Sequence, residues 1–163
     1  MQRVVVIGIS GSGKSVFSQR LGEKLHIPVI HLDAYFHTAG WKKVTKTDWD
    51  KQIESFIRQK TWILDGNYKR TLDVRIKAAD IVIYLEIPKW LAFYRIIKRR
   101  MTNRSIKRPD LPVYLNEQIS LTLIRKTLFY SKKEMFAIIN KHKTSQHIIV
   151  LKGTKSINTF LNK

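Results

Sequence analysis

The chain of 163 residues contains no cysteine. Disulfide bridges and zinc sites with thiolate ligands are therefore excluded, and a reducing compartment, the cytoplasm, is expected. No hydrophobic run approaches the roughly 20 residues that a membrane-spanning helix needs, so a membrane is not an expected partner. Hydrophobic residues still make up 44% of the sequence. That content predicts one domain over residues 1–163 with a substantial core.

Acidic residues are also scarce. There are 12 Asp and Glu against 31 Lys and Arg, which gives a formal net charge of +19. Such a charge attracts polyanions, and nucleic acid is a usual partner. An enzyme with two phosphorylated substrates also needs positive potential at its cleft, whereas lysines dispersed over a solvated surface need no partner. Composition leaves these interpretations open.

Glycine is uncommon too, yet three of the seven glycines stand together in the stretch GISGSGKS, Gly8–Ser15. The stretch matches the pattern G-x-x-x-x-G-K-[ST] of phosphate-binding loops. Val4–Ile7 before it predicts a buried strand, and the spacing of Phe17, Leu21 and Leu25 after it predicts a helix. The stretch is therefore predicted to be a turn between a strand and a helix.

This turn has the residue types that a triphosphate requires. Glycines let backbone N–H groups converge on phosphate oxygens, and the start of the helix adds positive potential. Lys14 is expected to bridge the β- and γ-phosphates, and the Ser15 hydroxyl to hold Mg²⁺. The other residues predicted to bind ATP here are Gly8, Ser10, Gly11, Ser12, Gly13 and Val16.

Apolar runs alternate with helical patterns along the rest of the chain. Strands are predicted at Val4–Ile7, Val29–Leu32, Trp62–Leu64, Ile81–Leu85 and His147–Leu151. Helices are predicted near residues 15–25, 48–60, 70–78, 88–102 and 116–142. This alternation predicts an α/β fold with a five-stranded parallel sheet and helices on both faces.

Ligands of such sheets bind beyond the carboxyl ends of the strands. Asp33 follows the second predicted strand and Asp65 the third. Asp65 is expected to hold Mg²⁺ together with Ser15, and Asp33 to act as acceptor ligand, base or metal-water ligand. An Asx turn or a helix cap is the alternative for each aspartate. His31 is expected to be a packed or exposed histidine without a catalytic role.

Basic residues gather between Arg95 and Arg108 without any acid among them. Arg95 and Arg99 are four residues apart and share a helix face, beside an apolar stripe of Trp90, Phe93, Ile97 and Met101. Guanidinium groups suit the charge that spreads over a transferring phosphoryl group. A solvated or nucleic-acid-contacting face is the alternative interpretation.

Several of these residues together resemble adenylate-kinase-like P-loop kinases, namely the phosphate loop, the Asp65-Gly66 pair and the R-I-I-K-R spacing of residues 95–99. The longer pattern HLD…GW…WILDGNYKRTLDVRIKAADIVIYLEIP…RPD more closely resembles the DNA topology modulation proteins, a family related to adenylate kinase. The resemblance covers about residues 2–161. It implies a nucleoside-monophosphate-kinase-like fold that uses ATP and Mg²⁺.

The same resemblance assigns further residues. Arg95 and Arg99 match an arginine pair that grips nucleotide base and phosphate beside a mobile lid. Arg108 with Asp110 resembles the R-x-D after that lid, which would be a short segment over residues 102–115. Gly153-Thr154 resembles the turn whose backbone faces adenine. The residues expected to act in catalysis are thus Lys14, Asp33, Arg95, Arg99 and Arg108.

The sequence also departs from adenylate kinases. Residues 67–70 read N-Y-K-R where those enzymes have F-P-R and then a glutamine that reads AMP, and residues 33–48 hold three lysines but no arginine. AMP is therefore not expected as the acceptor. The sequence predicts a kinase that transfers the γ-phosphate of Mg-ATP to a small, anionic acceptor, with a nucleoside or nucleotide among the candidates. A nucleic-acid-binding regulator switched by a nucleotide is the alternative function.

Overall fold

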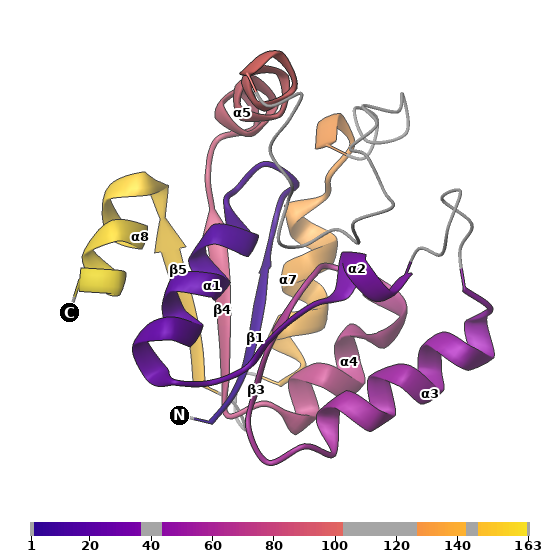
Figure 1. Cartoon of the computed structure of the whole chain (residues 1–163). Coiled ribbons are helices and arrows are strands. Elements are labelled where there is room, and N and C mark those ends of the chain that lie inside the picture. The colour runs from indigo at the N-terminus through magenta and orange to yellow at the C-terminus, as the bar shows by residue number, and fades with distance from the viewer. Residues whose placement is uncertain (1, 37–43, 103–126, 143–146, 163) are drawn as a thin grey trace.

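The computed structural model describes residues 2–36, 44–102, 127–142 and 147–162. Its centre is a parallel sheet in the order β2-β3-β1-β4-β5. Figure 1 shows β3, β1, β4 and β5 side by side in this order. The strands are β1 (Arg3–Gly8), β2 (Val29–His31), β3 (Trp62–Asp65), β4 (Ile81–Glu86) and β5 (His147–Lys152). All four pairings are parallel. The predicted five-stranded parallel sheet is therefore confirmed.

Helices connect the strands. They are α1 (Lys14–Leu25), α2 (Leu32–Phe36), α3 (Lys46–Ile57), α4 (Lys69–Ala78), α5 (Lys89–Thr102), α7 (Lys132–Asn140) and α8 (Gly153–Asn162). Four of them match the predicted helices to within about three residues. The short α2 and the last helix α8 were not anticipated by the periodicity.

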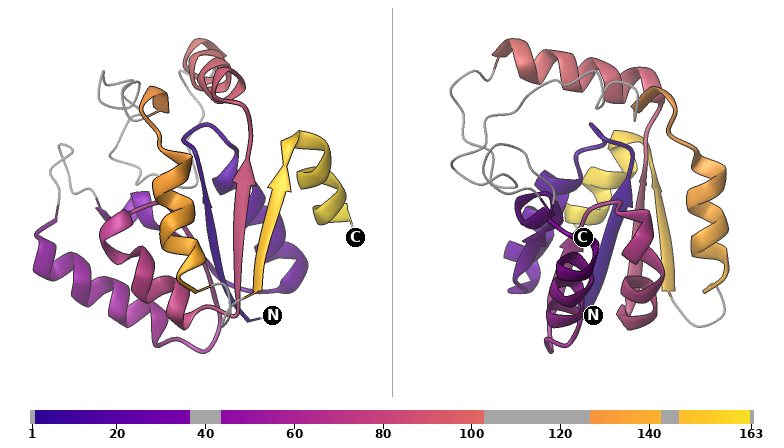
Figure 2. Two further views of the ribbon diagram at one scale, coloured as in Figure 1. Left: turned by 180° about the vertical axis from the view of Figure 1, so that it is seen from behind. Right: turned by 90° about the vertical axis from the view of Figure 1, so that its right-hand side faces the viewer.

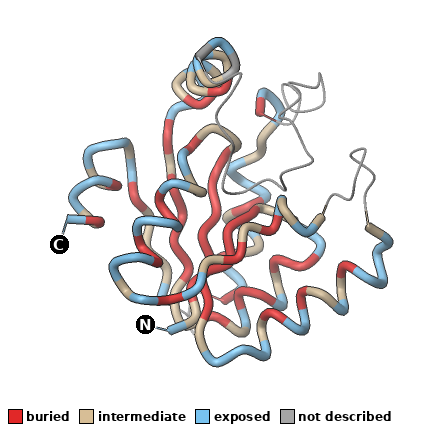
Figure 3. Tube along the Cα trace, viewed as in Figure 1, coloured by how far each residue is buried: buried red, intermediate tan, exposed pale blue. Residues whose placement is uncertain are grey.

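The sheet is covered on both faces because successive side chains of a strand point in opposite directions. Val5 and Ile7 of β1 belong to a core cluster shared with α3, α4 and α7. Val4 and Val6 belong to a second cluster shared with α1 and α8. Figure 2 shows the two helical layers edge-on, and Figure 3 shows that the buried residues run along the strands between them. These layers hold the carboxyl ends of the strands at one edge.

The predicted helix over residues 116–142 is wrong in its middle. Residues 116–126 lie outside the described part of the chain, and α7 begins only at Lys132. Ser131 is the N-cap of α7, and its side-chain oxygen accepts a hydrogen bond from the Glu134 N–H at 3.2 Å. The S-x-x-E spacing is a helix-start signal that the apolar periodicity conceals.

In the described residues, no helix has the length and apolar character to cross a bilayer.

Candidate nucleotide and acceptor site

The predicted phosphate loop connects the end of β1 to the start of α1. Gly11 and Gly13 have left-handed backbone angles, with φ of 83° and 91°. A Cβ at Gly11 would lie 2.4 Å from the carbonyl oxygen of Ala92, so a larger residue cannot be placed there without moving α5. Glycine thus permits both the turn and the close approach of α5.

The start of α1 meets the requirements of an anion site. Gly13 is the N-cap, and among the described residues no side chain caps the helix. The first helical hydrogen bond runs from the Phe17 N–H to the Gly13 carbonyl at 2.9 Å, so the N–H groups of the first turn have no intrahelical acceptor. Lys14 Nζ donates to the Ile9 carbonyl at 3.2 Å and therefore lies along the loop. Phosphate oxygens fit these donors.

Asp65 is the last residue of β3, the strand that lies beside β1. Its side chain is buried, and its Oδ2 lies 3.0 Å from Nδ1 of His31. His31 and Asp65 are register partners at the ends of β2 and β3. The histidine is packed, as expected, but sequence reasoning missed its contact with the predicted magnesium ligand. The adjacency of these two strands is the fact that was needed to predict it.

The carboxylate and hydroxyl oxygens near the loop suit a Mg²⁺ ion that is bound together with a nucleotide. In the described part of the chain, no group of three or more His, Cys, Asp or Glu side chains forms a dedicated metal site. Mg²⁺ bound with a nucleotide keeps several waters and takes only one or two protein oxygens besides the phosphates. The buried Asp65 carboxylate and the half-buried Ser15 hydroxyl at the start of α1 are oxygens of this kind.

Asp33 lies one strand further from the phosphate loop, in the first turn of α2. It is exposed, and its Oδ1 accepts a hydrogen bond from the Tyr68 hydroxyl at 2.6 Å. Burial and the charge of Asp33 raise the pKa of Tyr68, so the phenol stays a donor. The Tyr68 ring packs against Phe36 and Trp49, with centroids 4.5 and 4.8 Å apart. Asp33 is thus an open carboxylate beside an aromatic cluster.

Asn67 joins the loop after β3 to the phosphate loop. Its Oδ1 accepts from the Gly8 N–H at 3.1 Å, and its Nδ2 donates to the Gly8 carbonyl at 2.7 Å. Gly66 N–H also donates to the Val6 carbonyl, at 3.2 Å. Sequence reasoning noted Asn67 only as a departure from adenylate kinases and missed its contact with Gly8. The two residues are 59 positions apart, and no local pattern announces the pair.

Arg95 approaches the phosphate loop from α5. Its Nη1 donates to the Ser12 carbonyl at 3.3 Å, and its Nη2 donates to the Thr154 hydroxyl at 2.8 Å. Thr154 and Gly153 begin α8, directly after β5. The structure therefore brings together Arg95, the phosphate loop and the predicted adenine turn. Arg99 lies one helical turn further along α5 and is half-buried.

Arg108 and nearly all of the predicted lid, residues 102–115, lie outside the described residues. The described part of α5 buries Ala92 and Ile96, whereas Trp90 is 70% exposed and Met101 78% exposed. The apolar stripe predicted on α5 is therefore not a core face at either end.

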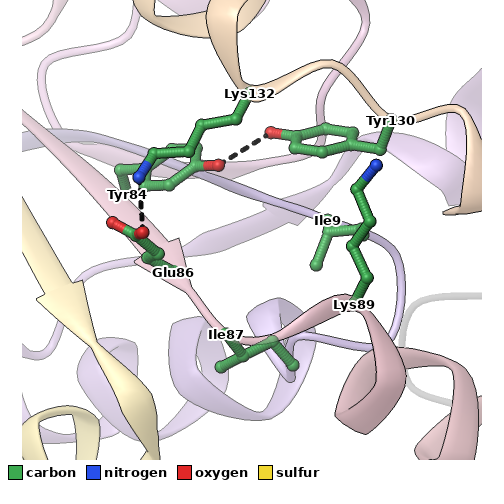
Figure 4. A pocket seen from close by; sticks show the side chains of 7 residues that line it. All are labelled: Ile9, Tyr84, Glu86, Ile87, Lys89, Tyr130 and Lys132. Atoms are coloured by element: carbon green, nitrogen blue, oxygen red, sulfur yellow. Dashed lines mark hydrogen bonds and ion pairs between the residues drawn. The ribbon is translucent and has the colours of Figure 1, made fainter.

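A small cavity of about 90 Å³ lies at the end of β4, beside Ile9 of the phosphate loop. Figure 4 shows the side chains that line it. Its polar walls are largely paired with one another. Tyr130 donates to the Tyr84 hydroxyl at 3.3 Å, Lys132 pairs with Glu86, and Lys89 Nζ donates to the Leu128 carbonyl at 3.0 Å. The cavity lining consists of Ile9, Tyr84, Glu86, Ile87, Lys89, Tyr130 and Lys132. These contacts fix residues 128–132 against the end of β4 and the start of α5.

No protein-family model matches the chain, and a search of curated proteins gives no match. Solved structures do match. A shikimate kinase from Acinetobacter baumannii, solved with shikimate, has a TM-score of 0.62 at 15% identity, over 99% of this chain and 89% of its own.

Two further structures are similar. A gluconokinase from Sinorhizobium meliloti has a TM-score of 0.57 at 15% identity, over 99% of this chain and 87% of its own. A sugar kinase from Janibacter has a TM-score of 0.55 at 17% identity, over 99% and 93%. None of these matches bears on the resemblance to DNA topology modulation proteins. They confirm the predicted fold: the chain has the α/β architecture of P-loop kinases.

Proposed function

We propose that the protein is a kinase that transfers the γ-phosphate of Mg-ATP to a small acceptor carrying a hydroxyl group. The observation that carries this proposal is the arrangement around Gly8–Ser15. Two carboxylates, Asp65 at the end of β3 and Asp33 just after β2, lie on one side of this loop, and the guanidinium of Arg95 touches the loop from the other side. Phosphoryl transfer requires such a set of groups.

On the nucleotide side, the N–H groups of the loop and Lys14 bind the phosphates. Ser15 and Asp65 would hold Mg²⁺, which would supply neutralisation of the charge on the nucleotide's phosphates. His31 lies against Asp65 at 3.0 Å and keeps that carboxylate in place. Arg95 and Arg99, with Arg108 from outside the described residues, stabilise the charge of the transferring group. Gly153 and Thr154 flank the base.

On the acceptor side, Asp33 orients the attacking hydroxyl and takes its proton. A bond forms between the acceptor oxygen and the γ-phosphorus, and the bond from that phosphorus to the bridging oxygen breaks. The proton moves to Asp33, and ADP leaves. The hydrogen bond from Tyr68 to Asp33 Oδ1 orients the carboxylate for this role.

The net charge and the similar structures support a small, anionic acceptor. The net charge of +19 favours an anionic acceptor. Shikimate and gluconate are small hydroxyl-bearing carboxylates, and two of the matching structures are a shikimate kinase and a gluconokinase. Compounds of this class, together with sugars, nucleosides and nucleotides, form the first acceptor panel.

The test is an assay of ADP release and phosphorylated product over that panel, with Lys14→Ala and Arg20→Ala as matched variants. Both remove one cation from α1, but Arg20 is an exposed residue beyond the loop. Lys14→Ala is expected to lower turnover at least about 100-fold, as for other preorganised donors, and to leave the fold intact. Arg20→Ala is expected to retain wild-type turnover. Full activity in Lys14→Ala would contradict the assignment of the phosphate loop.

A nucleic-acid-binding regulator is the second candidate function. The net charge of +19 and the acid-free stretch of residues 95–108 favour it. In that case the nucleotide would act as a switch, and no acceptor would be phosphorylated. The salt dependence of binding separates the two functions.

A further inference from the structure

The guanidinium of Arg75, on α4, is completely buried. Burying a cation is costly unless its N–H groups find acceptors. Here they are backbone carbonyl oxygens: Nε donates to Thr71 at 3.3 Å, Nη1 to Gly66 at 2.8 Å and Nη2 to Tyr68 at 3.0 Å. Burial lowers the pKa of Arg75 to about 10, and nearby Asp65 limits the fall, so the group is protonated at neutral pH.

Two of these carbonyls belong to the loop of residues 66–68, which leads from β3 to α4. They flank Asn67, whose amide binds both the N–H and the carbonyl of Gly8. The same loop begins directly after Asp65 and carries Tyr68, whose hydroxyl binds Asp33. One short loop is therefore bonded to the phosphate loop and to the predicted acceptor ligand, and follows the predicted magnesium ligand.

We propose that Arg75 is a positioning residue: from inside the core it fixes the 66–68 loop, and through this loop it sets the placement of Gly8, Asp65 and Asp33. The inference rests on the proposed function in taking ATP as the ligand of Gly8–Ser15. It does not depend on which acceptor is used.

The chemistry of the side chain explains why arginine is needed. A planar fork donates from fixed directions to two carbonyls that are two residues apart, which a lysine ammonium cannot reproduce. An apolar residue would leave the Gly66 carbonyl without this donor. The Tyr68 carbonyl would keep its bond from the Thr71 N–H at 3.1 Å. Loss of the fork should therefore release the Gly66 side of the loop first.

A core residue of α4 provides the matched control. Ile76 is also completely buried and follows Arg75 directly, but it packs into the hydrophobic core between the sheet and the helices. Ile76→Ala destabilises the fold through a cavity. It removes no hydrogen bond to the loop, so it separates loss of stability from loss of positioning.

The first measurement is amide hydrogen exchange on the full-length Arg75→Lys and Ile76→Ala proteins, with amides of β4 and β5 as the reference for global opening. The Gly8 N–H, bonded to Asn67, and the Gly66 N–H, bonded to Val6, report on the loop. In Arg75→Lys both are expected to exchange about tenfold faster relative to the reference, since local opening precedes global unfolding. A uniform change across all amides, as in Ile76→Ala, would overturn the positioning role.

The second measurement is the affinity for a non-hydrolysable Mg-ATP analogue. It is expected to fall about tenfold in Arg75→Lys and to stay within about twofold in Ile76→Ala, because small misplacements of binding groups are costly. Asn67→Ala should show a similar loss, and the double variant less than the product of the two losses, because both act through one loop. Independent, multiplying losses would overturn the relay.

Two outcomes need separate treatment. If Arg75→Lys does not fold, Arg75→Gln, which still offers amide donors to the loop, takes its place in both measurements with the same expected and contrary results. If the wild-type protein binds the analogue but phosphorylates no acceptor, the proposed function fails. The hydrogen exchange and affinity comparisons then still decide the role of Arg75.

Discussion

The two flanks of the phosphate loop are built differently. On the β2–β3 flank, the carboxylate of Asp65 and the guanidinium of Arg75 are buried, and Asn67 binds Gly8 through two hydrogen bonds. On the other flank, Arg95 touches the loop from α5, whose described side chains bury only Ala92 and Ile96. Figure 2 shows α5 lying across the carboxyl edge of the sheet rather than against a face.

This difference matches two different chemical requirements. A metal ligand and a base act over hydrogen-bond distances, so they need fixed placement. A cation that neutralises spreading charge acts electrostatically and can be supplied by a helix that is less embedded. The β2–β3 flank, which carries Asp65 and Asp33 and is here called the acidic flank, is therefore expected to be the more sensitive to the loss of a single group. The flank of Arg95, here called the basic flank, is expected to lose less activity when the charge is kept and only the directed hydrogen bonds of the arginine are removed.

Of the two flanks, the acidic flank is expected to show the larger effect, in Asp65→Asn. The amide keeps the size of the side chain and its contact with His31 but removes the negative charge that is proposed to hold Mg²⁺. Turnover is expected to fall about 100-fold, with binding of metal-free ATP unchanged. Mg²⁺ titrations of the reaction provide the measurement. Wild-type Mg²⁺ dependence in the variant would exclude Asp65 as a ligand of Mg²⁺.

A smaller effect is expected on the basic flank, from Arg95→Lys. The charge is kept, but the fork that reaches both the Ser12 carbonyl and the Thr154 hydroxyl is lost. Turnover is expected to fall about tenfold, with the melting temperature unchanged. Lys98→Arg, at an exposed position on the same helix, is the matched control, and its turnover should equal that of the wild-type protein. Unchanged kinetics in Arg95→Lys would show that Arg95 contributes only positive charge at the surface and has no catalytic role.

The contrast between the flanks also explains what the sequence could predict. The strands were predictable because strands buried on both faces read as continuous apolar runs. The phosphate loop was predictable because its geometry demands glycines at fixed spacing. Lys14, Ser15 and Asp65 could be proposed on that basis, whereas Arg95 was proposed from the acid-free basic stretch of residues 95–108 and from the resemblance to adenylate-kinase-like kinases.

The contacts of the acidic flank could not be predicted in the same way. The His31–Asp65 pair depends on β2 lying beside β3, which periodicity does not determine. Asn67 binds a residue that is 59 positions away in the sequence. The sequence does not distinguish Arg75 from an exposed arginine of a helix, because its burial depends on how α4 packs against the sheet. The S-x-x-E start of α7 was a local signal hidden by apolar residues on either side of it.

A residue remote from both flanks tests whether stability and activity separate. Burial alone would raise the pKa of Asp80, but hydrogen bonds from the Gln2 and Arg3 N–H groups and from the Arg3 guanidinium lower it. The folded protein thus holds this carboxylate deprotonated to lower pH than the unfolded chain does. Its contribution is present above the unfolded pKa and is lost as pH falls through the folded pKa.

Asp80→Asn is therefore expected to lower the free energy of unfolding by about 1 kcal/mol at neutral pH, with turnover unchanged. Urea unfolding between about pH 5 and pH 3 should show a weaker loss of stability with acid than in the wild-type protein. An equally steep loss in the variant would exclude Asp80 as a source of the acid sensitivity.

The smallest effect is expected from salt on Mg-ATP binding, and it separates the two candidate functions. A kinase uses its positive charge locally, and contacts inside a partly dehydrated cleft are screened less than an open surface, so Mg-ATP affinity should change less than about threefold between about 50 and 200 mM salt. Duplex DNA held through six or more phosphate contacts should lose a factor of about 10³ over the same range. Parallel titrations with an ATP analogue and a labelled duplex provide the measurement, and duplex binding is expected to be weak and independent of sequence at 200 mM.

Tight, sequence-selective duplex binding at that salt concentration, with no phosphorylated product from any acceptor, would favour the nucleic-acid regulator over the kinase. The net charge of +19 fits either function. The salt dependence of the two affinities therefore shows whether this charge acts on a nucleotide in a cleft or on DNA at an open surface.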